Sequence, residues 1–256
     1  MAEQLTMKLE VRHLTKTFGG VRAIDDVSLA FPSGSLSAVI GPNGAGKSTF
    51  FNLISGAFAP DSGEVLLDGE DVVRRSKAER MQLGIGRAFQ VASCFPSMTV
   101  AENLMAAVTA HLGQWGNLAR RFPLPGARER AREVMELVGL SHIADVEAAI
   151  LSHGDQKLLD IAIALALEPK VLLLDEPTAG MGPDERWGMI ERVRGLWDQQ
   201  KLTLVFIEHD MDIVFQVAST IRVLCYGRVL AEGTPDEIRN NQAVIDAYLG
   251  KEEHDP

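Results

Sequence analysis

Hydrophobic and polar residues alternate near the N-terminus. Leu9, Val11 and His13 are spaced by two, and residues 24–31 hold a second such β-rich run, a pattern that predicts half-buried β-strands. Residues 63–67 are expected to form a strand, and it meets Asp68-Gly69, a dipeptide typical of a hairpin turn. We therefore expect the start of the chain to form an antiparallel β layer.

From about residue 96 to residue 150 the apolar spacing becomes helical. Thr99 and Glu102 fit the capping pattern at the start of a helix. Residues 128–138 carry an apolar stripe on one helical face and end at Gly139. Residues 113–126 are rich in Gly, Pro and Arg and are expected to be an exposed connection. We interpret residues 96–155 as a helical subdomain inserted into an α/β core.

Continuous apolar runs at residues 36–40, 171–174 and 203–207 predict strands buried on both faces of a parallel sheet. Residues 156–168 are apolar nearly all round and predict a buried helix. The expected helix 184–200 has a stripe that we interpret as core-facing, formed by Trp187, Ile190, Val193 and Trp197. Residues 221–225 and 229–231 predict a hairpin, and residues 234–237 open a capped helix with proline at its first position.

Composition narrows the classes of function. The 256 residues are 46% hydrophobic, enough for one large domain or a domain with a subdomain. The net charge of −10 argues against a nucleic-acid binder with a broad basic surface. No apolar run reaches the ~18 residues of a membrane-spanning helix, and no secretory signal is expected.

The cysteines and the clustered arginines do not require a functional role. Cys94 and Cys225 have neither metal-ligand spacing nor the density of a disulfide framework, which favours a reduced, cytosolic compartment. The arginines cluster, and we favour solvated helix faces over a docking role for them. The clustered residues are Arg74, Arg75, Arg80, Arg120, Arg121, Arg128, Arg130 and Arg132.

One stretch carries the strongest chemical signal. It fits the phosphate-loop pattern G-x-x-x-x-G-K-[ST] and runs Gly41, Pro42, Asn43, Gly44, Ala45, Gly46, Lys47, Ser48, Thr49. It lies between an expected strand and an expected helix at residues 48–55, where orphan N–H groups and the helix dipole favour an anion. Lys47 would reach the β- and γ-phosphates of a nucleotide, and the Ser48 hydroxyl would bind Mg²⁺.

A pair of carboxylates follows the buried run at 171–174. Asp175 fits a Walker B carboxylate that holds Mg²⁺, and Glu176 fits a general base for an attacking water. Burying unpaired charge is unfavourable by several kcal/mol, so a purely structural role is the weaker interpretation.

Further motifs follow in order, and together the set resembles the ATPase subunits of ATP-binding-cassette (ABC) transporters over residues 7–250. Residues 151–156, Leu-Ser-His-Gly-Asp-Gln, look like the family's LSGGQ signature. Gln90 looks like the Q-loop glutamine, His209 like the switch histidine, and Phe18 like the aromatic that stacks on adenine. Residues 179–183 stand where the D-loop belongs.

The resemblance implies a single ABC domain over residues 1–256 with an α/β P-loop NTPase fold, a mixed or parallel sheet, the antiparallel layer and the helical subdomain. Residues 7–95 and 156–250 would form the nucleotide-binding core, and residues 96–155 the signature subdomain. ATP and Mg²⁺ are the implied cofactors.

The resemblance also implies roles for single residues. Two cassettes would pair head to tail, with Ser152 and Gly154 of one covering the nucleotide of the other. Gln90 would ligate Mg²⁺ beside Asp175, and His209 would contact the γ-phosphate. Three positions depart from the family pattern: His153 replaces a signature glycine, Asp155 the signature glutamine, and Gly182 a frequent aspartate.

Within the family, the chain is most similar to the branch that imports branched-chain amino acids. Its implied partners are two membrane permease subunits, a second cassette or a second copy of itself, and indirectly a periplasmic binding protein, with no nucleic acid. Its implied place is the cytoplasmic face of the cell membrane. Urea or amide importers, a lipopolysaccharide exporter, a soluble cassette ATPase in translation or DNA repair, and a regulatory nucleotide sensor remain alternatives.

Overall fold

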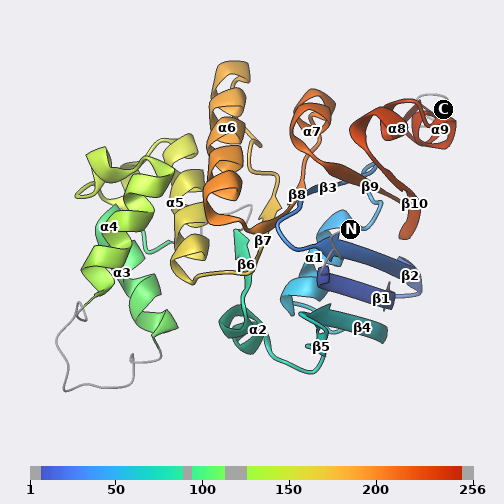
Figure 1. Cartoon of the computed structure of the whole chain (residues 1–256), viewed down its shortest axis with the longest axis horizontal. Helices are drawn as coiled ribbons and strands as arrows, with labels where there is room; N and C mark the ends of the chain where they lie inside the picture. Colours follow the sequence, from blue (N-terminus) through green and yellow to red (C-terminus); the bar gives the residue numbers. More distant parts are fainter. Residues whose placement is uncertain (1–6, 89–93, 113–125, 250–256) are drawn as a thin grey trace, which may run out of the picture. The chain divides into compact units, whose positions relative to one another are not determined.

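The computed structural model describes residues 7–88, 94–112 and 126–249 (Figure 1). The chain divides into two compact units, one formed by Met1–Arg80 with Lys201–Pro256 and the other by Met81–Gln200. The predicted helical subdomain, residues 96–155, lies wholly inside the second unit. Its boundaries stay a prediction.

An antiparallel sheet opens the first unit and confirms the predicted β layer. Its strand order is β2-β1-β4-β5, formed by β1 (Met7–Phe18), β2 (Val21–Pro32), β4 (Ser62–Leu67) and β5 (Glu70–Asp71). Asp68 and Gly69 both have positive φ, at 51° and 82°, as a tight hairpin turn requires. Leu9, Val11 and Leu14 of β1 are buried, so one face of this layer belongs to the core.

A second sheet in the first unit carries the phosphate loop. Its order is β10-β9-β3-β8, formed by β3 (Leu36–Ile40), β8 (Thr203–Ile207), β9 (Thr220–Cys225) and β10 (Arg228–Gly233). Strand β3 pairs in parallel with both β8 and β9, and β10 returns antiparallel to β9. Every residue of β3 and of β8 is buried, as their continuous apolar runs predict.

Helices complete the first unit around these sheets: α1 (Lys47–Ser55), α7 (Met211–Val217), α8 (Pro235–Arg239) and α9 (Gln242–Leu249). Helix α2 (Lys77–Leu83) runs across the boundary between the units. Helix α8 begins with the predicted capping box of Thr234 and Glu237. None of the helices that the structure describes is long and apolar enough to cross a membrane.

The second unit contains a parallel strand pair and four helices: β6 (Ile85–Ala88), α3 (Val100–His111), α4 (Ala127–Val138), α5 (His153–Ala166), β7 (Val171–Asp175) and α6 (Pro183–Gln200). Two 3₁₀ turns, Ser141–Ile143 and Ala148–Ile150, lead from α4 to α5. The predicted Thr99 capping box opens α3, and Gly139 ends α4 in the left-handed conformation. Most of the predicted connection at residues 113–126 lies outside the described residues.

Three predictions at the level of elements were wrong. Helix α5 begins at His153 instead of Gln156, because the Ser152 side chain caps it. On α6 the predicted core stripe is confirmed for Ile190 and Val193, which are buried along with Met189 and Leu196, but it is wrong for Trp187 and Trp197, which are only half-buried. A side chain as large as indole fits the edge of the helical face better than its centre.

Arg80 is the third, since it does not lie on a solvated helix face. Its side chain is 1% exposed, and it donates to the carbonyls of Leu53 and Ile54 at the end of α1 at 2.6 and 2.8 Å. Burial lowers the pKa of this guanidinium. The cation is therefore solvated by backbone carbonyls at the negative end of the α1 dipole.

Candidate functional site

The phosphate loop joins β3 to α1, as predicted. Lys47 is the first residue of α1 and only 7% exposed, and its Nζ donates to the Gly41 carbonyl at 2.6 Å and to the Pro42 carbonyl at 3.2 Å. Ser48 is exposed, so its hydroxyl is accessible from solvent. The lysine side chain therefore folds back over the loop and places its ammonium group beside the loop backbone.

Two glycines of this loop occupy positions where a side chain has no room. A Cβ at Gly41 would lie 2.0 Å from the Leu224 carbonyl oxygen, and one at Gly46 would lie 2.4 Å from that of Ala23. Both residues also have positive φ, which disfavours other residue types. Gly44 has positive φ as well, but open space surrounds it.

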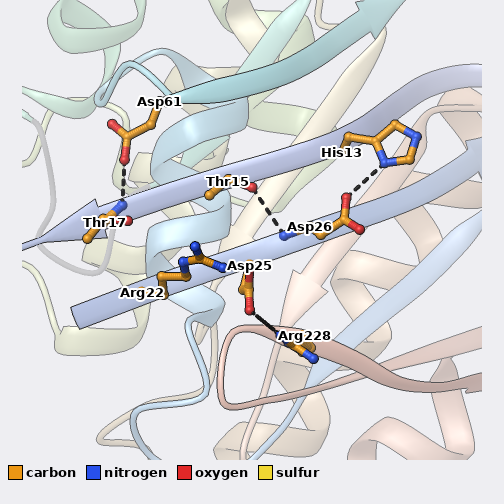
Figure 2. A network of polar contacts seen from close by, with 8 residues as sticks. All are labelled: His13, Thr15, Thr17, Arg22, Asp25, Asp26, Asp61 and Arg228. Carbon is orange, nitrogen blue, oxygen red and sulfur yellow. Dashed lines mark hydrogen bonds and ion pairs between the residues drawn. The ribbon is translucent and has the colours of Figure 1, made fainter. Parts of the chain in front are cut away.

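The turn between β9 and β10 holds the loop from outside. Gly227 N–H donates to the Ala45 carbonyl at 3.1 Å, and Asp25 N–H donates to the Gly227 carbonyl at 2.8 Å. Arg228 then pairs with the Asp25 carboxylate at 2.7 Å, as Figure 2 shows. The hydrogen bond from Arg228 lowers the pKa of Asp25. The start of β10 is thus tied through β2 to the phosphate loop.

Phe18 ends β1 and is 43% exposed, so it is not a plain core residue. It packs edge-on against Phe58, whose ring centroid lies 5.4 Å away, and Lys16 Nζ lies 5.4 Å from the Phe18 ring centroid. Asp61 accepts from Thr17 N–H at 2.7 Å (Figure 2) and from Lys16 at 2.8 Å. The hydrogen bond from Lys16 lowers the pKa of the Asp61 carboxyl. The sequence did not reveal Phe58 as the partner of this ring.

Tyr248 of α9 is a contact that the sequence missed. Burial raises its pKa to about 12, and a hydrogen bond from the Gly41 backbone partly opposes that rise. The C-terminal helix therefore reaches the first glycine of the phosphate loop.

His209 follows β8 and is exposed, whereas its neighbour Glu208 is 4% exposed. His209 N–H lies 3.2 Å from a Glu208 carboxylate oxygen, and Asp210 caps α7. The imidazole is thus held on a short link between a buried strand and a capped helix.

In the second unit, Asp175 is the last residue of β7, and its side chain is 7% exposed. Arg87 of β6, whose side chain is equally buried, donates to Asp175 Oδ2 at 2.8 Å. This ion pair was not predicted, because it depends on which strand lies beside β7. It explains how a carboxylate is accommodated in a buried position.

Glu176 comes next, with a φ of 50°. Such a left-handed conformation is unfavourable for a residue other than glycine, and Pro177 restricts it further. Lys157 of α5 is 6% exposed and donates from Nζ to the Glu176 carbonyl at 3.2 Å. The same carbonyl accepts from Ala179 N–H at 3.1 Å.

The signature residues lie at the N-terminus of α5. Ser152 Oγ accepts from Asp155 N–H at 3.1 Å and donates to the Asp155 carboxylate at 2.7 Å. Gly154 is part of the same first turn, and His153 Nε2 lies 3.1 Å from the Ala179 carbonyl oxygen. Gln90, which is also a predicted site residue, lies outside the described residues.

The ligands predicted for Mg²⁺ are all oxygen donors, which suits this hard cation. The described part of the chain holds no group of three or more His, Cys, Asp or Glu that could form a metal site by itself. Mg²⁺ is usually bound through one or two carboxylates together with substrate phosphates, so this residue set fits it.

Sequence comparisons identify the family of this chain and several of its relatives. Residues 24–179 match the ABC transporter family, and residues 228–254 match the family described as branched-chain amino acid ATP-binding cassette transporter. The high-affinity branched-chain amino acid transport ATP-binding protein BraF of Pseudomonas aeruginosa is 38% identical over 95% of this chain and 98% of its own length. LivG of Escherichia coli K12, with the same description, is 37% identical over 95% of this chain and 98% of its own.

A solved structure supports the fold. The crystal structure of a nucleotide-free ATP-binding cassette from an ABC transporter has a TM-score of 0.82 and 32% identity, covering 94% of this chain and 98% of that one. The predicted α/β P-loop fold is thereby confirmed, as is the resemblance drawn from the motifs. Family and fold together mean that the chain binds nucleotide and acts as an ATPase. The chain belongs to the ATP-binding subunits of the ABC transporter family.

Proposed function

We propose that this chain is the ATP-hydrolysing subunit of a membrane importer for branched-chain or related amino acids. The phosphate loop carries the hydrolytic part of the proposal, because its glycines and Lys47 form a preorganised anion site at the start of α1. The match of residues 228–254 supports the substrate class.

The phosphate loop has the binding role in this proposal. Its residues, Gly41 through Thr49, bind the nucleotide phosphates, and Lys47 places a positive charge beside the β- and γ-phosphates. Phe18 stacks on adenine with one ring face, while Phe58 packs against the Phe18 ring at an interplanar angle of 69°. Mg²⁺ is held by Ser48, Asp175 and Gln90, and it supplies charge neutralisation of the phosphates.

Glu176 orients and deprotonates the attacking water, and His209 contacts the γ-phosphate. Such a reaction depends on positioning and on charge stabilisation rather than on covalent chemistry. The Arg87–Asp175 pair supports the metal role, because the guanidinium holds Asp175 Oδ2 at 2.8 Å and so restricts the orientation of the carboxylate.

Ser152 and Gly154 serve the nucleotide of a second cassette, a different chain or a second copy, paired head to tail. The first turn of α5 offers backbone N–H groups and a positive dipole end for this purpose. The assembly lies on the cytoplasmic face of the membrane against two permease subunits, fed by a periplasmic binding protein. No nucleic acid takes part.

Phosphate release from ATP tests the enzymatic proposal. Glu176→Gln should lower kcat at least ~100-fold while ATP still binds, because the base is lost and the phosphate loop is intact. Glu133→Gln is the matched control, since that carboxylate is exposed and pairs with the nearby Arg130. Equal rates for Glu176→Gln and the wild type would refute the role of Glu176.

Isolation from native membranes tests the transport proposal. Mass spectrometry of the gently purified complex should find two permeases and a second cassette. Ribosomal or DNA-repair partners without a permease would refute transport and leave the ATPase chemistry standing.

A further inference from the structure

Two side chains on one face of α5 bind the backbone that follows β7. His153 and Lys157 are four residues apart, so they lie on the same side of the helix. His153 Nε2 lies 3.1 Å from the Ala179 carbonyl oxygen, and Lys157 Nζ lies 3.2 Å from that of Glu176. The two contacts are thus made at the two ends of the segment 176–179.

The backbone of the segment 176–179 begins in an unfavourable conformation, so it depends on hydrogen bonds from its surroundings. Glu176 has a φ of 50° and precedes Pro177, so its backbone is in a conformation that persists only where the surroundings hold it. Two successive turns follow, with hydrogen bonds from Ala179 N–H to the Glu176 carbonyl and from Met181 N–H to the Thr178 carbonyl. Fixing the Glu176 carbonyl restricts the rotation that would return the residue to an extended conformation.

The surroundings of both side chains fit such a role. Lys157 is 6% exposed and lines a cavity of about 10 Å³ together with Asp160 and Asp175. A Cβ at Gly180 would lie 3.0 Å from His153 Nε2, so glycine at that position leaves space for the imidazole. A glycine at position 153, as in the family signature, would offer no side-chain donor.

We propose that His153 and Lys157 are positioning residues that clamp the segment 176–179 and thereby fix the direction of the Glu176 side chain. Neither touches the reacting atoms. The catalytic consequence rests on the proposed role of Glu176, whereas the clamp itself does not. The departure of residue 153 from glycine thus adds a link from the signature to the D-loop within one chain.

Amide hydrogen exchange in the nucleotide-free chain tests the clamp without relying on activity. Lys157→Met and His153→Ala should speed exchange at the Ala179 and Met181 amides about tenfold, since each removes a hydrogen bond that restrains the turn. His153→Gln keeps a side-chain donor and should restore part of the protection. Arg192→Met is the matched control, because Arg192 also donates to a backbone carbonyl, that of Val138, away from this segment.

ATP turnover then tests the consequence. Lys157→Met should lower kcat about tenfold with little change in KM, because the phosphate loop is untouched and only the general base is misplaced. Unchanged exchange in both variants would overturn the clamp, whatever happens to kcat. Faster exchange in a chain whose wild type hydrolyses no ATP would support the clamp and refute the proposed function. If Lys157→Met melts early, His153→Ala decides, since His153 is exposed.

Discussion

The phosphate loop and the segment that carries Glu176 are both bent away from regular structure, but they are held in opposite ways. In the phosphate loop, unusual backbone angles fall on glycines, and neighbouring carbonyls leave no room for side chains at Gly41 and Gly46. At Glu176 the unusual angle falls on a charged residue, and side chains of α5 restrain it. The backbone of the first region is therefore sensitive to added side-chain atoms, and that of the second to the loss of the α5 side chains that hold it.

Removing the Lys47 charge breaks the first region most severely. Lys47→Met should lower ATP turnover by roughly 100- to 1,000-fold, because a preorganised charge beside the phosphates is lost. Lys8→Met, which removes a surface lysine paired with Asp68, should leave turnover unchanged. Retention of full ATP affinity and turnover in Lys47→Met would contradict the assignment of the loop.

The next-largest effect is expected when one methyl carbon is added to the phosphate loop. Gly41→Ala should lower the free energy of unfolding by about 3 kcal/mol, since the new Cβ meets the Leu224 carbonyl. Gly44→Ala adds the same carbon in open space, so only its backbone strain of about 1 kcal/mol should appear. Urea unfolding of the two variants measures the difference, and equal losses would show that crowding does not distinguish the two glycines.

Relieving the strain at Glu176 sharpens the comparison. Glu176→Gly should raise the free energy of unfolding by about 1 kcal/mol, because glycine accepts a positive φ at little cost. The same substitution should abolish hydrolysis, because it removes the carboxylate of the general base. Lys201→Gly is the reference, as Lys201 has a φ of 51° and lies outside the site. A gain at Lys201 without one at Glu176 would mean that the α5 contacts already offset the strain.

Asp155 places a negative charge in the signature, whereas residues 41–49 of the phosphate loop contain no acidic side chain. Asp155→Asn should tighten ATP-dependent pairing of cassettes about two- to fivefold, since it removes a negative charge near the phosphates that Ser152 would meet. Equilibrium sedimentation with the ATP-bound Glu176→Gln chain measures it, with Asp198→Asn on α6 as control. Weaker pairing would indicate that the carboxylate is needed to orient the Ser152 hydroxyl.

The smallest expected effect concerns pH. The pKa of Asp25 is lowered in the folded chain, chiefly by Arg228, from an ordinary value of 3.8. Its contribution to stability is therefore present above about pH 4 and is lost as the pH falls through the folded pKa. The stability difference between wild type and Asp25→Asn should shrink between pH 5 and pH 3, and Asp61→Asn should behave likewise. A difference independent of pH would contradict the ion pair.

Local patterns predicted most of the fold. The strands β3 and β8, the Thr99 and Thr234 caps and the Asp68-Gly69 turn each depend on residues close together in the sequence. The phosphate loop belongs to the same class, because its function resides in one short run of backbone. The tryptophans on α6 were misplaced because helical spacing gives a face without saying how large a side chain that face accepts.

The missed parts of the site are all pairings between distant segments. Arg87 meets Asp175 only because β6 lies beside β7, and Lys157 meets Glu176 only because α5 packs near the end of β7. Arg80 was predicted to be exposed, because the spacing of apolar residues gives no information about backbone partners. In the structure its guanidinium donates to four backbone carbonyls. Charge in a sequence thus predicts a partner poorly when that partner is the main chain.

The turn between β9 and β10 offers a place for an optical reporter. Tyr226 is 82% exposed, and the next residue, Gly227, is bonded through its amide to the phosphate loop. The sequence of the first unit's two ranges, Met1–Arg80 and Lys201–Pro256, contains no tryptophan. An indole introduced by Tyr226→Trp would therefore be the single such fluorophore of the first unit, and its emission would follow nucleotide arrival in a stopped-flow instrument without a chemical label.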